Sequence, residues 1–188
     1  FTDSLHGHAL LTDGMLLNTT NGGASWERVI AKKGEQIDLL RFASRDTGYA
    51  VSSAHLFRSY DGGKTWDSTK NSDVSNRLFI QTISNDIIYY GSDFFGTLYY
   101  TKDAGKTSNY YGFYDMGIDD IVSDISFVNN QIGYVFCTLG QIAKTVDGGQ
   151  NWTRVDIPEK VGSTGNFFTS EIGLAATNNS VYRTENGG

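Results

Sequence analysis

Residues 59–66 read SYDGGKTW, and this stretch decides the fold because it recurs along the chain. The other copies read TTNGGASW at 19–26, TKDAGKTS at 101–108 and TVDGGQNW at 145–152, and a fifth begins as TENGG at 184–188. The complete copies follow one another after 40, 42 and 44 residues. A fixed period near 40 residues indicates a repeat architecture, so the chain is predicted to consist of stacked copies of one unit.

The repeat extends upstream of each turn motif. A phenylalanine precedes a glycine by six positions at Phe1, Phe42, Phe127 and Phe167. The third copy is degenerate: Tyr89 stands where this glycine is expected, and Ala104 and Ser108 replace a glycine and the tryptophan of the motif. The whole unit therefore repeats, and not only its turn.

Each unit contains short apolar runs separated by turn residues. In the second copy these runs are 37–42, 48–51, 56–59 and 65–68, rich in β-branched and aromatic residues, and no helical periodicity competes with them. Four strands in about 40 residues are typical of a β-propeller blade. The sequence predicts an all-β chain of four-stranded antiparallel blades in one propeller domain over 1–188, with repeats at about 1–29, 30–69, 70–111, 112–157 and 158–188.

The turn motif has a structural explanation. An Asp or Asn at its third position accepts backbone N–H groups of the same turn, and the glycines supply the positive φ of a tight hairpin. The tryptophans just beyond are expected to cover the turn and to fill space between blades. The residues assigned this structural role are Thr19, Asn21, Gly23, Trp26, Ser59, Asp61, Gly63, Trp66, Thr101, Asp103, Gly105, Thr145, Asp147, Gly149 and Trp152.

The motif resembles the Asp-box, or bacterial neuraminidase repeat. With its doubled glycine and the preceding Phe-x5-Gly-Tyr-Ala-type strand pair, the chain is most similar to the photosystem II stability/assembly factor family and its bacterial relatives. Asp-boxes also occur in sialidases, in xyloglucan-cleaving endoglucanases and in sortilin-type receptors. In those families the box lies away from the active site, so the resemblance implies a structural role for Asp61 and Asp147.

Composition excludes several classes. The 188 residues carry 15 Lys plus Arg against 21 Asp plus Glu, which disfavours nucleic acid as the partner because a phosphate backbone is held by clustered cations. No apolar run approaches the length of about 20 residues that a membrane-spanning helix needs. The single cysteine, Cys137, is expected to be a small buried hydrophobe.

The chain begins at Phe1 and ends inside the fifth motif. Neither end supplies the strand that the other end lacks for closing a ring. We therefore expect an arc of about four and a half blades from a six- to eight-bladed propeller.

Two enzymatic alternatives share the turn motif. A sialidase would need an arginine cluster and an early Arg-Ile-Pro segment, and the chain has seven Arg and no such segment. A xyloglucanase-like hydrolase would need two carboxylates roughly 5 to 10 Å apart across a cleft. Asp115, Asp119 and Asp120 lie in the longest connection between repeats, beside Tyr110, Phe113 and Tyr114, but no other connection carries a comparable acidic and aromatic cluster.

Candidate binding residues lie in two loops: Phe94 and Phe95 in the loop 92–96, and Tyr114, Asp115 and Asp119 in the long connection. Exposed aromatic anchors would bind a partner. Alternatively, both sets of rings pack inward and the acids are solvated. Sequence alone leaves both interpretations open.

We expect no metal site and no cofactor, because no carboxylate or thiol joins His6 and His8 at ligand spacing. No catalytic residue is assigned. The predicted function is a non-enzymatic scaffold outside the cytoplasm, whether secreted, periplasmic, lumenal or at the cell surface. Its partner is a protein or larger assembly, with a glycan as a further possibility, and the alternative function is a glycoside hydrolase.

Overall fold

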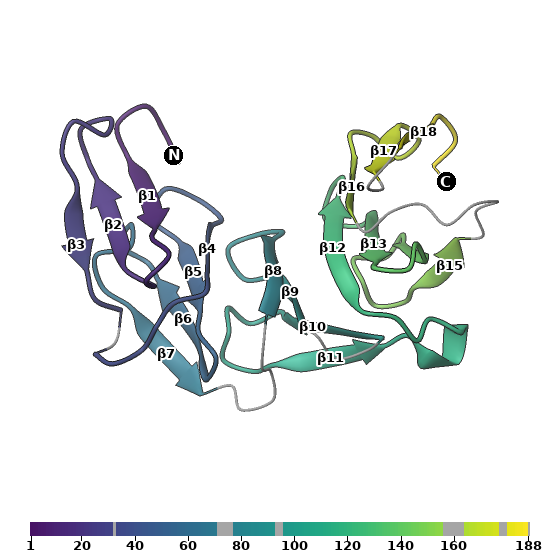
Figure 1. Cartoon of the computed structure of the whole chain (residues 1–188), viewed down its shortest axis with the longest axis horizontal. Coiled ribbons are helices and arrows are strands. Elements are labelled where there is room, and N and C mark those ends of the chain that lie inside the picture. The colour runs from purple at the N-terminus through teal and green to yellow at the C-terminus, as the bar shows by residue number, and fades with distance from the viewer. Residues whose placement is uncertain (32, 71–76, 93–95, 156–163, 177–179, 188) are drawn as a thin grey trace. The chain divides into compact units, whose positions relative to one another are not determined.

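The chain folds into antiparallel β-sheets that follow one another along the sequence (Figure 1). The computed structural model describes residues 1–31, 33–70, 77–92, 96–155, 164–176 and 180–187. These residues form 18 strands in five sheets and one short 3-10 helix. The all-β, blade-like fold predicted from the repeats is confirmed.

The residues group into two compact units. The first comprises Phe1–Ile88 with Thr101–Ser108, and the second comprises Tyr89–Tyr100 with Asn109–Gly188. The assignment of all five repeats to one domain stays a prediction.

Two sheets, one of three strands and one of four, lie entirely within the first unit. The first has the order β1-β2-β3, with β1 Gly7–Leu10, β2 Leu16–Thr19 and β3 Glu27–Val29. The second has the order β4-β5-β6-β7, with β4 Leu39–Phe42, β5 Gly48–Val51, β6 His55–Ser59 and β7 Asp67–Lys70. The four strands of this second sheet begin within two residues of the runs predicted for that repeat.

The third sheet has the order β11-β10-β9-β8, and the division between the units passes through it. Its strands are β8 Arg77–Thr82, β9 Ile88–Ser92, β10 Thr97–Thr101 and β11 Asn109–Gly112.

Two further sheets lie in the second unit, after the 3-10 helix η1 Tyr114–Met116. The fourth sheet joins β12 Val122–Phe127, β13 Gly133–Cys137, β14 Ile142–Thr145 and β15 Thr153–Val155 in that order. The fifth joins β16 Thr164–Phe167, β17 Gly173–Ala176 and β18 Val181–Thr184.

The repeated phenylalanine and glycine are cross-strand partners. Phe42 pairs with Gly48, Phe127 with Gly133 and Phe167 with Gly173. A Cβ atom on these glycines would lie 2.5, 2.6 and 2.6 Å from the paired ring. Glycine is therefore needed for the ring to lie across the opposite strand.

The same phenylalanine contacts the tryptophan of its own repeat edge-on. Ring centroids are 6.0 Å apart for Phe1 and Trp26, 6.1 Å for Phe42 and Trp66, and 6.2 Å for Phe127 and Trp152. Trp152 is 5% exposed, whereas Trp26 is 37% exposed. Each tryptophan thus packs on the phenylalanine of its own repeat, but the tryptophans differ in how deeply they are buried.

The third repeat corrects the expected position of this glycine. The turn hydrogen bond from Ile83 N to Ile87 O matches that from Ala43 N to Thr47 O, which aligns Thr82 with Phe42 and Ile88 with Gly48. Ile88, not Tyr89, therefore occupies the glycine position. The alignment by sequence is wrong by one residue because this repeat has no phenylalanine, and the apolar residue six positions before Tyr89 is Ile83, the neighbour of Thr82.

The third repeat also replaces the Phe, Gly and Trp together. Thr82, Ile88 and Ser108 stand in their places. A threonine opposite leaves room for the Ile88 side chain, which is fully buried. The three replacements are compatible as a set. Without the phenylalanine ring, the position of Ile88 no longer has to be glycine, and the position of Ser108 has no ring for a tryptophan to contact.

Each unit has a core between neighbouring sheets. In the first unit Leu16, Ile37, Ala50 and Phe57 form a buried cluster, and Trp66 packs against it. In the second unit the corresponding cluster consists of Tyr134, Phe136, Ile142 and Phe167. Cys137 is fully buried, and burial raises the pKa of its thiol to about 12, so it is a buried apolar side chain as expected.

Candidate functional site

The turn motifs form a closed network of hydrogen bonds. In the second turn, Ser59 Oγ donates to Asp61 Oδ1 at 2.8 Å and accepts from Gly63 N at 2.8 Å. Thr65 donates its backbone N–H to Asp61 Oδ1 at 2.9 Å and its hydroxyl to Oδ2 at 2.6 Å. Both carboxylate oxygens are thereby bound within the turn.

The other complete turns repeat this geometry. Thr107 contacts Asp103, and Asn151 contacts Asp147, in the way that Thr65 contacts Asp61. In the first turn Asn21 Oδ1 accepts from Ser25 N, while Asn21 Nδ2 donates to Ser25 Oγ at 2.8 Å. An amide can therefore take the place of the carboxylate in this turn, because the Ser25 hydroxyl accepts a hydrogen bond from Asn21 instead of donating one.

These hydrogen bonds change the acidity of the turn carboxyls. For Asp61 and Asp103, partial burial opposes ionisation, but the donors of Thr65 and Thr107 outweigh it and lower each pKa to about 2. For Asp147, the backbone N–H and the side-chain amide of Asn151 lower the pKa to about 2. A carboxylate that stays ionised down to about pH 2 with its oxygens engaged fits a structural element and not a proton donor near neutral pH.

The long connection 113–121 presents the predicted binding residues Tyr114, Asp115 and Asp119. Tyr114 is 57% exposed, and both aspartates are exposed. Phe113 and Ile118 on either side are fully buried. Of the rings expected in this connection, only Phe113 packs inward, where it contacts Trp152 edge-on at 5.8 Å between centroids.

Backbone contacts hold this connection in place. Met116 N and Gly117 N close the η1 turn on Phe113 O and Tyr114 O. Gly117 adopts a left-handed φ of 67°, and its carbonyl accepts from Gln141 Nε2 at 3.0 Å and from Arg154 Nη1 at 3.2 Å. Tyr114 is therefore presented on a fixed backbone.

Asp120 has a different role from its two acidic neighbours. It is 1% exposed, and its carboxylate accepts from Thr138 Oγ1 at 2.5 Å, from Ile121 N at 2.7 Å and from Leu139 N. These contacts fasten the connection to the loop between β13 and β14. Asp120 is thus a structural carboxylate, whereas Asp115 and Asp119 remain available to a partner.

The second predicted segment meets the first at Gly96. Phe94 and Phe95 lie outside the described residues. Gly96, which directly follows them, donates to Asp120 O and accepts from Phe113 N, each at 2.7 Å. A Cβ at Gly96 would lie 3.4 Å from the Tyr114 ring. The two segments singled out in the sequence therefore join at one place in the second unit.

A related contact in the first unit was not foreseen. Ser52 Oγ donates to Glu35 Oε2 at 2.6 Å, and His55 Nδ1 lies 3.1 Å from Glu35 Oε1. Ser52, like Thr138, comes directly after the second strand of its repeat. The available signal was a hydroxyl residue at this position together with an acid in the preceding connection.

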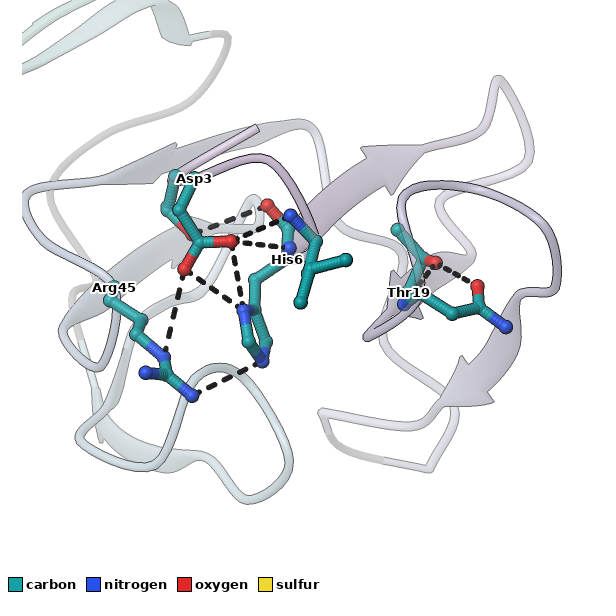
Figure 2. Close-up of polar contacts among 7 residues, drawn as sticks. Asp3, His6, Thr19 and Arg45 are labelled. Atoms are coloured by element: carbon teal, nitrogen blue, oxygen red, sulfur yellow. Dashed lines mark hydrogen bonds and ion pairs between the residues drawn. The ribbon is translucent and has the colours of Figure 1, made fainter.

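A polar cluster at the start of the chain surrounds His6. Figure 2 shows Asp3, His6 and Arg45 together: His6 Nδ1 lies 2.9 Å from both Asp3 carboxylate oxygens, and Arg45 Nη2 lies 3.2 Å from His6 Nε2. Arg45 can donate to Nε2 only if the ring is neutral with its proton on Nδ1. Backbone and side-chain hydrogen bonds from His6 lower the pKa of Asp3 to about 2.

His8 does not join this cluster. Its ring stacks on Phe42 at 3.5 Å between centroids, and its Nδ1 lies 2.9 Å from Asn18 Oδ1. Burial lowers the pKa of His8, an effect partly offset by the Asn18 contact. Both histidines line a cavity of about 320 Å³ together with acidic and basic side chains. Within the described residues no group of three His, Cys, Asp or Glu side chains is placed to hold a metal ion.

Among the described residues, no helix is long and apolar enough to cross a membrane.

Comparison with solved structures shows propeller folds. YCF48 from Cyanidioschyzon merolae superposes with a TM-score of 0.69 over 96% of this chain and 66% of its own, at 16% identity. The GH74 xyloglucanase from Xanthomonas campestris gives 0.66 over 100% of this chain and 34% of its own, at 17% identity. The C-terminal WD40 domain of Sif2 gives 0.69 over 98% and 55%, at 10% identity.

The chain spans about two thirds of the length of YCF48 and about one third of that of the xyloglucanase. No protein-family model and no curated protein matches the sequence. At these identities the likeness concerns the fold. The chain is similar to β-propellers that include both a YCF48 protein and a glycoside hydrolase, so it has the β-propeller fold.

Proposed function

We propose that this chain is a non-enzymatic binding scaffold that recognises a protein partner through the connection 113–121 and the adjoining loop 92–96. The observation that carries the proposal is the presentation of Tyr114, an exposed ring on a backbone fixed from both sides by Phe113, Ile118 and Asp120. A ring held in its bound position loses little conformational freedom on association, which favours affinity.

The chemistry of this surface favours a partner with basic and apolar groups. Asp115 and Asp119 are exposed in the same connection as Tyr114, and the connection 113–121 contains no Lys or Arg. The exposed Arg154 of β15 contacts it by donating to the Gly117 carbonyl. The assembly-factor role and a site outside the cytoplasm are part of this proposal and rest on the family resemblance of the turn motifs.

Asp120 gives the hydrolase alternative no support. A glycosidase of the two-carboxylate type needs a second carboxyl group available to substrate or water. Asp120 is buried and accepts three hydrogen bonds within the protein.

Site-specific photocrosslinking tests the proposal. A benzophenone amino acid at position 114 is expected to capture one protein from an extracytoplasmic extract of the source cells, and Asp115→Asn with Asp119→Asn is expected to reduce the yield. The matched control places the same probe at Tyr110, which is 70% exposed in β11.

Equal capture from both positions would contradict the proposed site. Turnover of xyloglucan or a sialoside that disappears in the double aspartate variant would instead establish the hydrolase.

A further inference from the structure

At the contact between two successive repeats, here called a junction, long side chains reach from one repeat to the next. In the fourth repeat these side chains are Tyr134 and Lys144, which are cross-strand partners in β13 and β14. Tyr134 Oη donates to Ser170 O and to Gly187 O, each at 3.2 Å. Lys144 Nζ donates to Gly187 O at 3.0 Å. A hydroxyl group and an ammonium group therefore converge on one main-chain carbonyl of the fifth repeat.

The second repeat has the same arrangement. Tyr49 and Arg58 are cross-strand partners in β5 and β6. Tyr49 Oη donates to Asn85 O, and Arg58 Nη1 donates to Ala104 O at 2.7 Å. A tyrosine hydroxyl and a cationic side chain thus cross both of these junctions.

The first repeat has shorter side chains at the same two positions. His8 stands in place of the tyrosine, and its cross-strand partner Asn18 stands in place of the cationic residue. His8 Nδ1 lies 2.9 Å from Asn18 Oδ1, so the two side chains contact each other. At this junction an imidazole and an amide therefore replace the hydroxyl group and the positive charge.

The main-chain carbonyls opposite these side chains have fewer donors than their counterparts. Gly62 holds the same position of its turn motif as Gly187, but its carbonyl accepts only from Asn18 Nδ2, at 3.2 Å. Arg45 corresponds to Ser170, and among the described residues none donates to the Arg45 carbonyl. This junction therefore has acceptor capacity that its own side chains do not fill.

The cavity of about 320 Å³ described above lies at this junction. His8, Asn18, Arg45 and Gly62 all line it. The first and second repeats enclose it, and both belong to the first unit. A cavity of this size is large enough for a small molecule. The space thus lies where the longer side chains of the other junctions would extend.

An acid beside the cavity lacks the cation that accompanies its counterpart. In the second repeat, Asp67 is the cross-strand partner of Arg58. In the first repeat, Glu27 is the cross-strand partner of Asn18 and lines the cavity. The acid is kept in the first repeat, whereas the cationic side chain next to it is replaced by an amide.

The other charges around the cavity balance one another. Arg45 is paired with Asp3, with 3.8 Å between Nε and Oδ2, and Asp61 is bound within its turn. A cation in the cavity is therefore placed by Glu27 and the two carbonyls and not by net charge. The charged side chains that line the cavity are Arg28, Arg45, Lys64, Glu27, Asp46 and Asp61.

We propose that this cavity binds a small amino alcohol. Its ammonium group takes the place of the missing cationic side chain and donates to the Gly62 carbonyl and to Glu27. Its hydroxyl group takes the place of the tyrosine hydroxyl and donates to the Arg45 carbonyl. Hydrogen bonds from an ammonium group to a carboxylate are among the stronger ones in proteins. The site lies in the first unit, apart from the connection 113–121, and does not depend on the proposed function.

Titration with ethanolamine, followed by NMR of the backbone amides at neutral pH and constant ionic strength, tests the proposal. Saturable shifts are expected at residues 45–46 and 62–63, with a dissociation constant of roughly 1–10 mM because so small a ligand makes few contacts. Ethylamine, which lacks the hydroxyl group, is expected to bind about threefold more weakly. Ethylene glycol and glycolate, which lack the ammonium group, are expected to bind at least about tenfold more weakly.

Two variants locate the binding in the cavity. The double variant His8→Tyr with Asn18→Lys copies Tyr134 and Lys144 of the fourth repeat, fills the space and is expected to lose the saturable shifts. Glu27→Gln is expected to weaken ethanolamine binding about tenfold. Glu171→Gln is the matched control, since Glu171 is an exposed glutamate of the second unit, and this variant is expected to bind like the original chain.

Three results would overturn the proposal. They are shifts that do not saturate, binding of ethylene glycol or glycolate as tight as that of ethanolamine, and unchanged binding by the filled variant. If the double variant does not fold, the comparison of Glu27→Gln with Glu171→Gln decides the same question, and equal affinities of these two variants would overturn the proposal.

Discussion

At the scale of single residues, the turn aspartates act through bound oxygens and not through reactivity. Asp61 receives hydrogen bonds from Ser59, Lys64 and Thr65. Asn21 makes the corresponding turn with an amide. The motif therefore requires a planar acceptor that reaches the backbone N–H groups, and ionisation is an additional property of three copies.

Ionisation makes these three turns sensitive to acid. A carboxyl with a pKa of about 2 in the folded chain and 3.8 in the unfolded chain stabilises the fold above pH 3.8, and this contribution is lost as the pH falls toward 2. Replacing Asp61, Asp103 and Asp147 by Asn is expected to flatten the pH dependence of the urea midpoint between pH 4 and 2.

The first turn supplies the converse test. Asn21→Asp places a carboxylate beside Ser25, whose hydroxyl can turn to donate to it as Thr65 does in the second turn. This variant is expected to steepen the acid dependence in the same pH window. If both sets of variants follow the original curve, the turn carboxyls do not determine acid stability.

At the scale of elements, the pairing of phenylalanine and glycine sets the shape of each sheet. Gly133→Ala is expected to lower the free energy of unfolding by about 1–3 kcal/mol, because its Cβ would lie 2.6 Å from the Phe127 ring. Adding Phe127→Thr, which copies Thr82 of the third repeat, is expected to relieve the clash. The measurement is a double-mutant cycle in urea.

Additive losses in that cycle would contradict the steric explanation. Gly112→Ala is a suitable control for the general effect of replacing glycine by alanine, because a Cβ at Gly112 would have no neighbouring heavy atom within 4 Å.

Asp119 and Asp120, adjacent in the long connection, are expected to differ in their effect on stability. Asp120→Ala removes a fully buried carboxylate that accepts from Thr138 and Leu139, and it is expected to cost about 1.5–3 kcal/mol, the range for hydrogen bonds to a charged group. Asp119→Ala changes an exposed side chain and is expected to stay within about 0.5 kcal/mol. Thermal unfolding measures the difference, and equal losses in both variants would contradict the assignment of Asp120.

Sequence spacing predicted the elements better than the contacts of individual residues. The period and the turn motif located four strands in the second repeat because glycines and β-branched residues act locally. Nothing local distinguishes Asp119 from Asp120, because the contacts that bury Asp120 come from Thr138 and Leu139 in the loop between β13 and β14. The glycine position of the third repeat was misplaced by one residue because Thr82 replaces the phenylalanine and its apolar neighbour Ile83 fits the pattern instead.

At the scale of the whole molecule, stability is expected to depend on each repeat and its nearest neighbours. Arg58→Met removes the donor to the Ala104 carbonyl and is expected to cost about 1.5–3 kcal/mol. The loss of hydrogen-exchange protection is expected in the turn 101–108, while the turn 145–152 keeps its protection. Arg28→Met, at an exposed arginine of β3, is the control for replacing an arginine by methionine. A loss spread evenly over all turns would show long-range cooperativity instead.

Three side chains that donate to a main-chain carbonyl in the turn of the next repeat were not recognised in the sequence, because they are chemically unlike one another. Asn18, Arg58 and Lys144 share a position and a capacity to donate, but no pattern of charge or size. The fold was predictable from what the repeats have in common, and the junctions were not, because there the repeats differ.

The acceptor of each of these hydrogen bonds between repeats is a main-chain carbonyl, and no amino-acid replacement can delete it. The acceptor is thus present in every repeat with the backbone itself. Only a side chain that is long enough to donate to it has to be maintained in the neighbouring repeat. A repeat of this kind carries the acceptor whatever its sequence, so only the donating side chain of its neighbour has to be specified.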